Sequence, residues 1–374
     1  MRTIAAILLA AIGAAAWAAD AGVSAGKISI GMSVPLTGPL SNYGTQLRRG
    51  LAMGLEQVNA AGGIAGREIE LVVKDDAGRP EQALANTRSL LETGVLAMTG
   101  YHGAGAIEAV LPVLESAGVP LVGVASSAEL LREPARRNVF NLRAGAREEA
   151  AAMVLHLDTL GITEVAVLAQ DDALGRAGLE GIQFELTRLA MRPQAVVRLA
   201  PEAGAAATTA AVQQACAGRP QGLMLVLDAR NALGAIRAAR RAGCGVRFYV
   251  TSEAGAQLLA SGTESTELAG LIVSQVVPHP ASGALPLQAD FQRVSAAAGV
   301  PPSYPGLEGF IYARVLAEVL RRCGREPTRR CLVASLEAKP LDLGGYRVQF
   351  APNDRRGSRF VEMTIVTADG RFRR

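Results

Sequence analysis

The sequence is poor in aromatic residues, histidine and cysteine. Aromatic residues make up 4% of its 374 residues, and it contains 3 histidines and 4 cysteines. Three histidines leave little from which to build a catalytic triad or a metal site. His156 falls within a helical pattern, His279 lies between two prolines, and only His102 stands in a turn suited to line a pocket. We therefore expect no catalytic residue, no metal and no cofactor, and hence not an enzyme.

Nucleotide-binding motifs and a strong charge of one sign are also missing. Gly100, Gly103 and Gly105 do not fit the G-x-G-x-x-G pattern, and no G-x-x-x-x-G-K-[ST] sequence occurs. The formal net charge is +4, and acidic and basic residues are interspersed along most of the chain. The short basic ending, 371–374, is typical of a solvated terminus. No nucleic-acid partner is expected.

Long apolar runs are absent beyond the N-terminus. No later segment offers the roughly 18 uninterrupted apolar residues of a membrane helix. The chain begins with Arg2, an apolar stretch from Ile4 to Ile12, and the small-x-small triplet Ala16-Trp17-Ala18. This order is typical of a secretory signal peptide, which we predict over residues 1–18. No cysteine lies nearby to carry a lipid anchor, so we expect a soluble periplasmic protein.

The four cysteines, Cys216, Cys244, Cys323 and Cys331, allow three disulfide pairings. Cys216 and Cys244 each end a predicted helix just before a strand, in consecutive units. Cys323 and Cys331 flank a short loop between two predicted helices. Because an exported protein meets an oxidising compartment, we predict the bridges 216–244 and 323–331. Neither spacing has the paired C-x-x-C of a zinc or redox site.

The rest of the chain alternates between apolar strand patterns and helical patterns. With 49% hydrophobic and 19% charged residues it is typical of a globular protein, and its length favours two domains. Predicted strands cover 27–34, 69–74, 96–99 and 120–124, and then 165–169, 194–199, 222–227, 247–251 and 271–277. This alternation predicts an α/β protein with two parallel sheets. The ending, with strands at 346–350 and 360–367, is hairpin-like, which suggests that the chain passes between the lobes more than once.

The stretch from Leu96 to Ser127 combines a strand end, a glycine-rich turn, a helix and a second strand end. Free N–H groups of Gly103, Ala104 and Gly105 at a helix N-terminus suit a carboxylate or phosphate. A tight strand-to-helix turn that needs glycine and binds nothing explains the same residues. This stretch alone does not choose between the two interpretations.

Other residues at predicted strand ends share the edge where parallel sheets bind ligands. The first lobe contributes Tyr43, His102 and the hydroxyls of Ser126 and Ser127, and the second lobe contributes carboxylates. The carboxylates come from the segment 171–174, from Asp228 and from Glu253. A zwitterion bridging the two lobes would satisfy both sets. Asp228 and Glu253 could equally be helix N-caps.

In its motifs the sequence resembles the type I periplasmic solute-binding proteins of ABC importers, in the leucine/isoleucine/valine-binding family. The resemblance covers residues 28 to about 371. The motifs that carry it, in order, are P-L-T-G-P-L-S-N-Y-G, V-N-A-A-G-G-I-A-G-R-E-I-E-L-V-V-K-D-D, A-G-V-P-L-V-G-V-A-S-S-A-E-L, V-A-V-L-A-Q-D-D-A-L-G-R-A-G and F-A-P-N-D-R-R-G. It implies two Rossmann-like (flavodoxin-like) lobes, joined by a hinge of three crossovers, with the ligand in the cleft. The implied lobes are 27–143 with 278–345, and 144–277 with 346–374.

The resemblance also implies roles for individual residues. The turn of His102, Gly103 and Ala104 would hold the ligand carboxylate by its N–H groups. Ala125 and Ser126 would hold its ammonium or carboxylate, Glu253 would bind an α-ammonium, and Tyr43 would stand at the cleft mouth.

Three positions depart from the family pattern. Ala104 stands where amino-acid binders often carry serine, Leu174 replaces an aromatic residue, and Asp228 lies where some relatives carry tyrosine. An aromatic or aliphatic acid or an amide is therefore an open alternative to an amino acid.

The resemblance implies an exported, monomeric substrate-binding protein that captures a small carboxylate-bearing solute and presents it to an ABC permease in the inner membrane. A periplasmic sensor that presents its ligand to a membrane receptor is the alternative.

Overall fold

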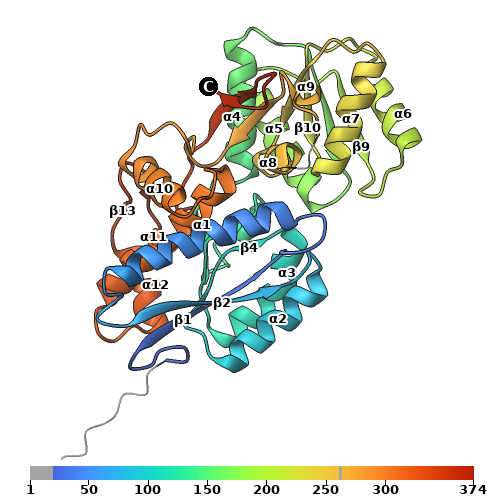
Figure 1. The fold of residues 1–374 in the computed structure, drawn as a ribbon. Coiled ribbons are helices and arrows are strands. Elements are labelled where there is room, and N and C mark those ends of the chain that lie inside the picture. Colours follow the sequence, from blue (N-terminus) through green and yellow to red (C-terminus); the bar gives the residue numbers. More distant parts are fainter. Residues whose placement is uncertain (1–19, 261–262) are drawn as a thin grey trace, which may run out of the picture.

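The computed structural model describes residues 20–260 and 263–374, so the predicted signal peptide, 1–18, lies outside the described residues. Two sheets, each flanked by helices, form two lobes that meet along one edge (Figure 1). Within the described residues no helix has both the length and the apolar character needed to cross a membrane. The predicted α/β architecture with two lobes is confirmed.

The first lobe is built on a five-stranded parallel sheet of order β2-β1-β3-β5-β7. Strand β1 is buried along almost its whole length because helices cover both faces of the sheet, as parallel sheets require. The strands are β1 Lys27–Val34, β2 Glu68–Asp75, β3 Ala97–Met98, β5 Leu121–Val122 and β7 Val139–Phe140. The helices are α1 Ser41–Ala60, α2 Pro80–Thr93, α3 Ala104–Ala117, η1 Glu129–Arg132, α10 Pro286–Ala297, α11 Tyr304–Cys323 and α12 Arg329–Ala338.

Two glycines redirect the first lobe's central strands toward the lobe boundary. Gly100 and Gly123 have φ angles of 70° and 79°, which non-glycine residues rarely adopt. After them the chain forms a second, two-stranded parallel pair, β4 (Tyr101–His102) with β6 (Val124–Ala125). The predicted strand at 120–124 is therefore two short strands. The second of these leads directly to Ser126.

The second lobe is built on a seven-stranded sheet of order β16-β15-β12-β11-β10-β8-β9. Five strands are parallel, and the last two pair antiparallel at one edge. The strands are β8 Val165–Gln170, β9 Ala195–Leu199, β10 Gly222–Val226, β11 Arg247–Val250, β12 Ile272–Gln275, β15 Glu362–Val366 and β16 Phe372–Arg373. The helices are α4 Ala146–Thr159, α5 Ala173–Arg188, α6 Ala205–Cys216, α7 Ala229–Arg241, α8 Ser252–Ala260 and α9 Ser265–Leu268.

The end of the chain corrects one expectation. The two segments at 346–350 and 360–367 do not pair with each other, so the predicted hairpin is wrong. Strand β14 (Arg347–Val348) pairs with β13 (Leu341–Asp342) in the first lobe, whereas β15 pairs with β12 in the second. Burial explains the difference, because Tyr346, Val348 and Phe350 belong to the first lobe's hydrophobic core. The structure thus keeps this segment with the first lobe, whereas the sequence assigned 346–374 to the second.

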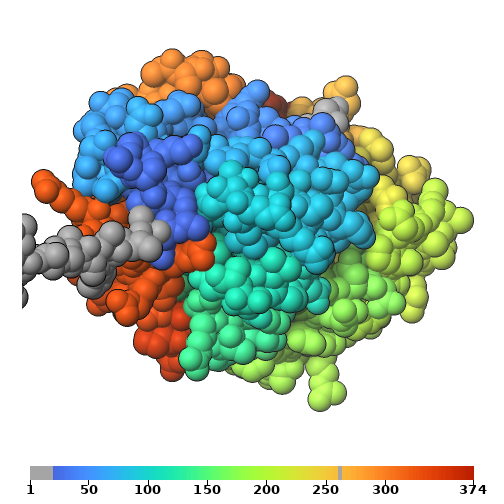
Figure 2. Space-filling model, turned by 90° about the horizontal axis from the view of Figure 1, so that it is seen from below, coloured from blue at the N-terminus to red at the C-terminus, as the bar shows by residue number. Residues whose placement is uncertain are grey.

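The chain passes between the lobes three times, after β7, after β12 and after β14. The first lobe therefore contains both early and late parts of the sequence. Seen from below, its surface joins the blue and cyan N-terminal segments to the orange and red C-terminal segments (Figure 2). Both predicted disulfides are confirmed, Cys216–Cys244 in the second lobe and Cys323–Cys331 in the first.

Helices α1 and α11 pack at backbone distance through glycines. A Cβ atom added to Gly309 would lie 2.0 Å from the carbonyl oxygen of Leu47, and one added to Gly50 would lie 1.8 Å from that of Gly306. Neither backbone can move without separating the helices. The close approach holds α11, and with it Glu308 and Tyr312, against the N-terminal half of the first lobe.

We predict that Gly309→Ala lowers the free energy of unfolding by about 3 kcal/mol, because the new methyl group meets backbone rather than a movable side chain. Urea unfolding followed by circular dichroism measures the loss. Gly234→Ala, in helix α7, is the matched control, since the new Cβ would lie 3.5 Å from Thr208 of α6, an ordinary contact distance. There alanine should be neutral or stabilise by roughly 0.5–1 kcal/mol. Equal effects of the two substitutions would contradict the packing argument.

Candidate functional site

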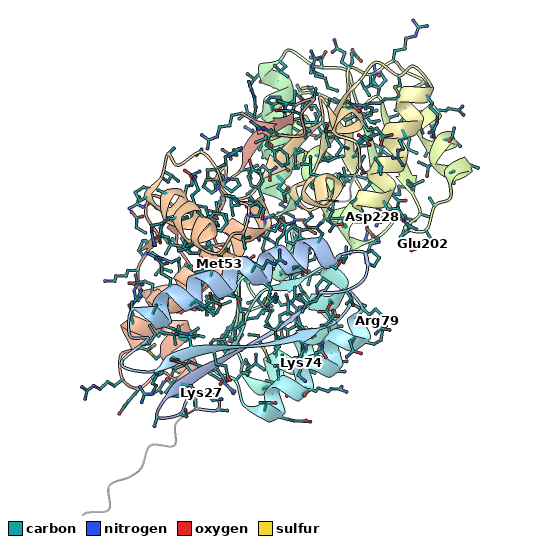
Figure 3. All side chains as sticks on the ribbon, in the orientation of Figure 1. Lys27, Met53, Lys74, Arg79, Glu202 and Asp228 are labelled. Carbon is teal, nitrogen blue, oxygen red and sulfur yellow. A yellow bond between two sulfur atoms is a disulfide. The ribbon has the colours of Figure 1, made fainter. Side chains whose placement is uncertain are left out.

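A cleft of about 360 Å³ lies between the lobes and is lined by both. The first lobe contributes the turn at Gly78 and Pro80, the start of α3 and Ser126. The second lobe contributes the N-terminal ends of α5, α7 and α8. Asp228 lies on the edge of the second lobe that faces the first, above Arg79 in the view of Figure 3. The carboxyl ends of the strands in both sheets therefore meet at one cavity.

Seven of the nine predicted site residues line this cleft. They are His102, Gly103, Ala104, Ser126, Leu174, Asp228 and Glu253. Residues more than 150 positions apart are brought together because βα units place their strand ends on a shared edge. Tyr43 and Ala125 are not among the lining residues.

Tyr43 lies beneath the cleft rather than at its mouth, so that expectation is wrong. Its ring stacks on His102 with centroids 4.3 Å apart and planes 5° apart, and only 3% of the residue is exposed. Its hydroxyl donates to Oε2 of Glu308 at 2.5 Å. Helix α1 turns this residue toward α11, and the phenol supports His102 from below.

His102 links the floor of the cleft to the second lobe. Its Nδ1 lies 2.8 Å from the carbonyl oxygen of Ala125, so this nitrogen carries the hydrogen. The free Nε2 then accepts from the side-chain amide of Gln257 in α8, at 3.4 Å. Ala125 thus acts through its main chain, and its side chain is fully buried.

The start of α3 provides unoccupied backbone donors. Among the described residues no side chain caps this helix, and Ala104, Gly105 and Ala106 all line the cleft. The first N–H groups of a helix have no intrahelical acceptor and lie at the positive end of its dipole. Gly103, at φ 89°, turns the chain sharply into the helix. This wall can hold an anionic group without any basic side chain.

The second wall carries carboxylates, and two of them are helix caps. Asp172 accepts from Gly175 N at 3.0 Å, and Asp228 accepts from Asn231 N at 2.8 Å. The N-cap interpretation of Asp228 is therefore confirmed. Glu253 is different, because it follows Ser252 in the first turn of α8. Its Oε1 accepts from Ser127 N at 2.6 Å, a hydrogen bond that crosses from one lobe to the other.

Beneath Glu253 lies a buried ionic cluster that the sequence did not predict. Arg143, in the first passage between the lobes, lies 3.5 Å from Oε1 of Glu149, 3.9 Å from Oε1 of Glu253 and 3.5 Å from Oε1 of Glu308. We call these four residues the Arg143 cluster. Apart from Glu253, which the sequence places at a strand end, these residues carry no motif, since each stands in an ordinary helix or linker pattern. Only the packing of four distant segments shows that they belong together.

The protonation of the cluster follows from burial and from the imbalance of charge. Burial alone would lower the pKa of Arg143, but Glu308, Glu253 and Glu149 more than offset it and raise that pKa. Burial also raises the pKa of Glu149, and Arg143 together with the hydrogen bonds from Ser252 and Ser274 counters this only in part. The guanidinium therefore stays charged, and Glu149 is harder to ionise than an exposed glutamate.

The charged side chains that line the cleft are all acidic, and the imidazole of His102 is the one other ionisable side chain among the lining residues. The acids are Glu108, Asp172, Asp228 and Glu253. Aliphatic groups, including Leu40, Leu174 and Leu227, form much of the remaining wall. No group of His, Cys, Asp and Glu side chains in the described part of the chain could hold a metal ion. The cavity therefore offers backbone donors on one side, a carboxylate on the other and apolar surface between them.

A family model described as periplasmic binding protein matches residues 27–371. The chain belongs to the periplasmic binding protein family. Within it the chain is of the type I class that includes the Leu/Ile/Val-binding proteins, and the resemblance deduced from the motifs is confirmed. Members of this family bind solutes and are not enzymes.

Individual members of the family are similar to this chain in sequence and in structure. A Leu/Ile/Val-binding protein homolog from Brucella melitensis is 30% identical over 170 residues, which are 45% of this chain and 46% of that protein. An extracellular ligand-binding receptor from Verminephrobacter eiseniae is 28% identical with a TM-score of 0.85, over 93% of this chain and 100% of the other. A possible leucine/isoleucine/valine-binding protein from Rhodopirellula baltica is 26% identical with a TM-score of 0.85, over 94% and 97%. The chain spans less than half the length of the curated relatives it matches.

The turn at Gly103 provides a test of the first wall. We predict that Gly103→Ala lowers the free energy of unfolding by roughly 1–3 kcal/mol, because φ 89° is unfavourable for any residue with a Cβ. Gly105→Ala is the matched control two residues on, where the new methyl would lie 3.6 Å from Pro80 with an ordinary helical φ. It should be neutral or slightly stabilising in urea unfolding. A neutral Gly103→Ala would show that the turn is not constrained as described.

Proposed function

We propose that this protein is an exported substrate-binding protein of an ABC importer, which captures a small solute bearing a carboxylate by closing its two lobes. The observation that carries the proposal is the arrangement of the cleft. Uncapped N–H groups of α3 stand on the first lobe, and the carboxylate of Glu253 stands on the second. A molecule with an anionic end and a cationic end matches both walls.

The size and lining of the cleft favour an amino acid with an aliphatic side chain. A volume of about 360 Å³ suits a small molecule, and leucine and alanine side chains cover much of the surface. The printed names of several relatives refer to leucine, isoleucine and valine, which supports the same class. Plain aliphatic or aromatic acids and amides are the alternative ligands, since the preference for an amine depends on Glu253.

Closure has a structural basis in the contacts that already join the lobes. Ser127 N donates to Glu253, and Gln257 approaches His102 from the opposite lobe. A ligand that binds only between the walls stabilises the closed arrangement by its differential affinity for that state. The proposal places the protein in the periplasm as a monomer that presents the closed form to a permease.

A ligand sensor that presents its closed form to a membrane receptor is the second candidate, because the cleft would serve it equally well. Permease genes beside the gene for this protein would favour the importer. Mass spectrometry of small molecules that co-purify with the protein, followed by thermal-shift screening of amino acids, organic acids and amides, tests the binding function itself. The absence of any stabilising ligand in that screen would contradict it.

Glu253→Gln tests the role of the second wall. The amide oxygen can still accept from Ser127 N, so the contact between the lobes survives while the charge is lost. We expect the affinity for an amino acid to fall about 10- to 100-fold, the cost of losing a charged hydrogen-bond partner, and the affinity for the amine-free acid to change little. Isothermal titration calorimetry measures both.

Asp228→Asn is the control for this substitution. It removes a charge from the same wall but keeps an N-cap for α7, because asparagine caps as well as aspartate. We expect its effect on both ligands to be small. Equal losses of amino acid and plain acid in Glu253→Gln would show that Glu253 does not recognise an amine.

A further inference from the structure

Arg143 joins the two lobes through its two terminal nitrogens. Nη1 donates to the hydroxyl of Tyr43 at 3.1 Å and faces Glu308, both in the first lobe. Nη2 donates to the hydroxyl of Ser252 and faces Glu149 and Glu253, all in the second lobe. The side chain is fully buried. Any change in the relative position of the lobes must therefore rearrange the partners of this guanidinium.

The three carboxylates of the cluster differ in how far their own hydrogen bonds satisfy them. Glu149 accepts from Ser252 N at 2.8 Å and from the Ser274 hydroxyl at 2.5 Å. Glu308 accepts from Tyr43 on one oxygen and from Tyr312, at 2.6 Å, on the other. Oε2 of Glu253 has no hydrogen-bond partner among the described residues. The least satisfied acid of the cluster is thus the one that lines the cleft.

Exposure separates the acids in the same way. The side chains of Glu149 and Glu308 are 1% and 3% exposed, whereas that of Glu253 is 15% exposed. One guanidinium faces three carboxylates, so the cluster carries more negative than positive charge. Because charges interact strongly in a buried site, this surplus is costly unless a proton or another cation compensates it. Glu253 is where a cation from the cleft can reach it.

Other titratable groups around the cluster do not remove the imbalance. The phenols of Tyr43 and Tyr312 donate hydrogen bonds, and their pKa values are raised mainly by burial, so they stay neutral. His102 gives its Nδ1 hydrogen to a carbonyl. A second buried guanidinium, Arg132, donates hydrogen bonds to main-chain carbonyls, including those of Ala128 and Ser126, and not to the three carboxylates. Among the acids, its charge interacts most strongly with Glu129 and less strongly with Glu148 and Glu149, so it offsets the surplus at Glu149 only in part.

We propose that binding of a ligand amine at Glu253 is linked to release of a proton from the Arg143 cluster, with Arg143 as the positioning residue that transmits the charge. This inference rests on the proposed function. Without ligand, Glu149 holds a proton that offsets part of the surplus charge of the cluster. When an ammonium group docks beside Oε2 of Glu253, that proton leaves to solvent. The cation then fills the same electrostatic role.

A proton on Glu149 is consistent with burial raising the pKa of that carboxyl group. The sign of the linkage follows. The ligand-free protein binds more protons than the amine complex, so affinity for an amine rises with pH through the titration of the cluster. Affinity for an acid without an amine does not follow this titration.

The test is isothermal titration calorimetry of the full chain at about pH 6, well below the pKa of an α-amine. The titration is run in two buffers of different ionisation enthalpy, phosphate and imidazole. The probes are L-leucine and L-phenylalanine with their amine-free counterparts, 4-methylpentanoate and 3-phenylpropanoate. For the amino acid that binds, we expect the two buffers to give different heats, corresponding to release of up to about one proton per ligand. For an amine-free acid we expect equal heats.

Glu308→Gln tests whether the cluster is the source of the proton. This acid is not among the residues that line the cleft, and the two tyrosine hydroxyls can pair with an amide as well as with a carboxylate. We expect proton release to fall by more than half and affinity for the amino acid to fall about tenfold, since one negative charge is lost. Glu337→Gln in α12 is the control, because it removes a carboxylate charge beside another buried arginine, Arg355, away from the cluster. It should change neither value.

The outcomes separate this inference from the binding function. Equal heats in both buffers for a bound amino acid, or equal proton release by its amine-free counterpart, overturn the inference and leave solute binding intact. Failure of both amino acids to bind also overturns the inference. The binding function is tested separately, by identifying the molecules that co-purify with the protein. If Glu308→Gln does not fold, the two-buffer comparison on the unsubstituted protein decides the question alone.

Discussion

A single buried guanidinium controls the boundary between the two lobes. Arg143 sits where the chain first leaves the first lobe, and it faces acids from α4, α8 and α11. A buried ion that lost these partners would cost several kcal/mol, so the elements that carry them are held in register. Glu253 is one of those partners and also lines the cleft. The charge that a ligand meets is therefore set by a network that extends through both lobes.

The backbone supplies the complementary half of the cleft. Gly100 and Gly123 end the sheet-forming parts of their strands and direct the chain toward the boundary, where the short pair β4–β6 leads to the start of α3 and to Ser126. Close packing of α1 on α11 brings Glu308 beneath Tyr43, and Tyr43 in turn supports His102. Backbone donors on one wall and a carboxylate on the other thus arise from different physical causes. A small zwitterion is the ligand class that uses both.

The sequence predicted what local patterns determine. Alternating strands and helices specify two parallel sheets, strand-end positions identify seven residues of the cleft, and the cysteine positions identify both disulfides. It could not predict features that depend on packing between distant segments. The cleft-mouth position that the resemblance implies for Tyr43 is wrong because the direction of a helical side chain depends on what α1 packs against. The hairpin predicted at the end of the chain is wrong because its two strands pair with β13 and β12, which lie in different lobes. Arg143 carries no motif at all.

The most direct test of the account is a crystal structure of the protein with the small molecule that co-purifies with it and that mass spectrometry identifies. The account predicts a carboxylate within hydrogen-bond distance of the N–H groups of Ala104–Ala106 and a cationic group beside Oε2 of Glu253, with both lobes in contact with the molecule. A ligand bound elsewhere, or one held in the cleft with no group near Glu253 and no contact with the start of α3, would contradict it.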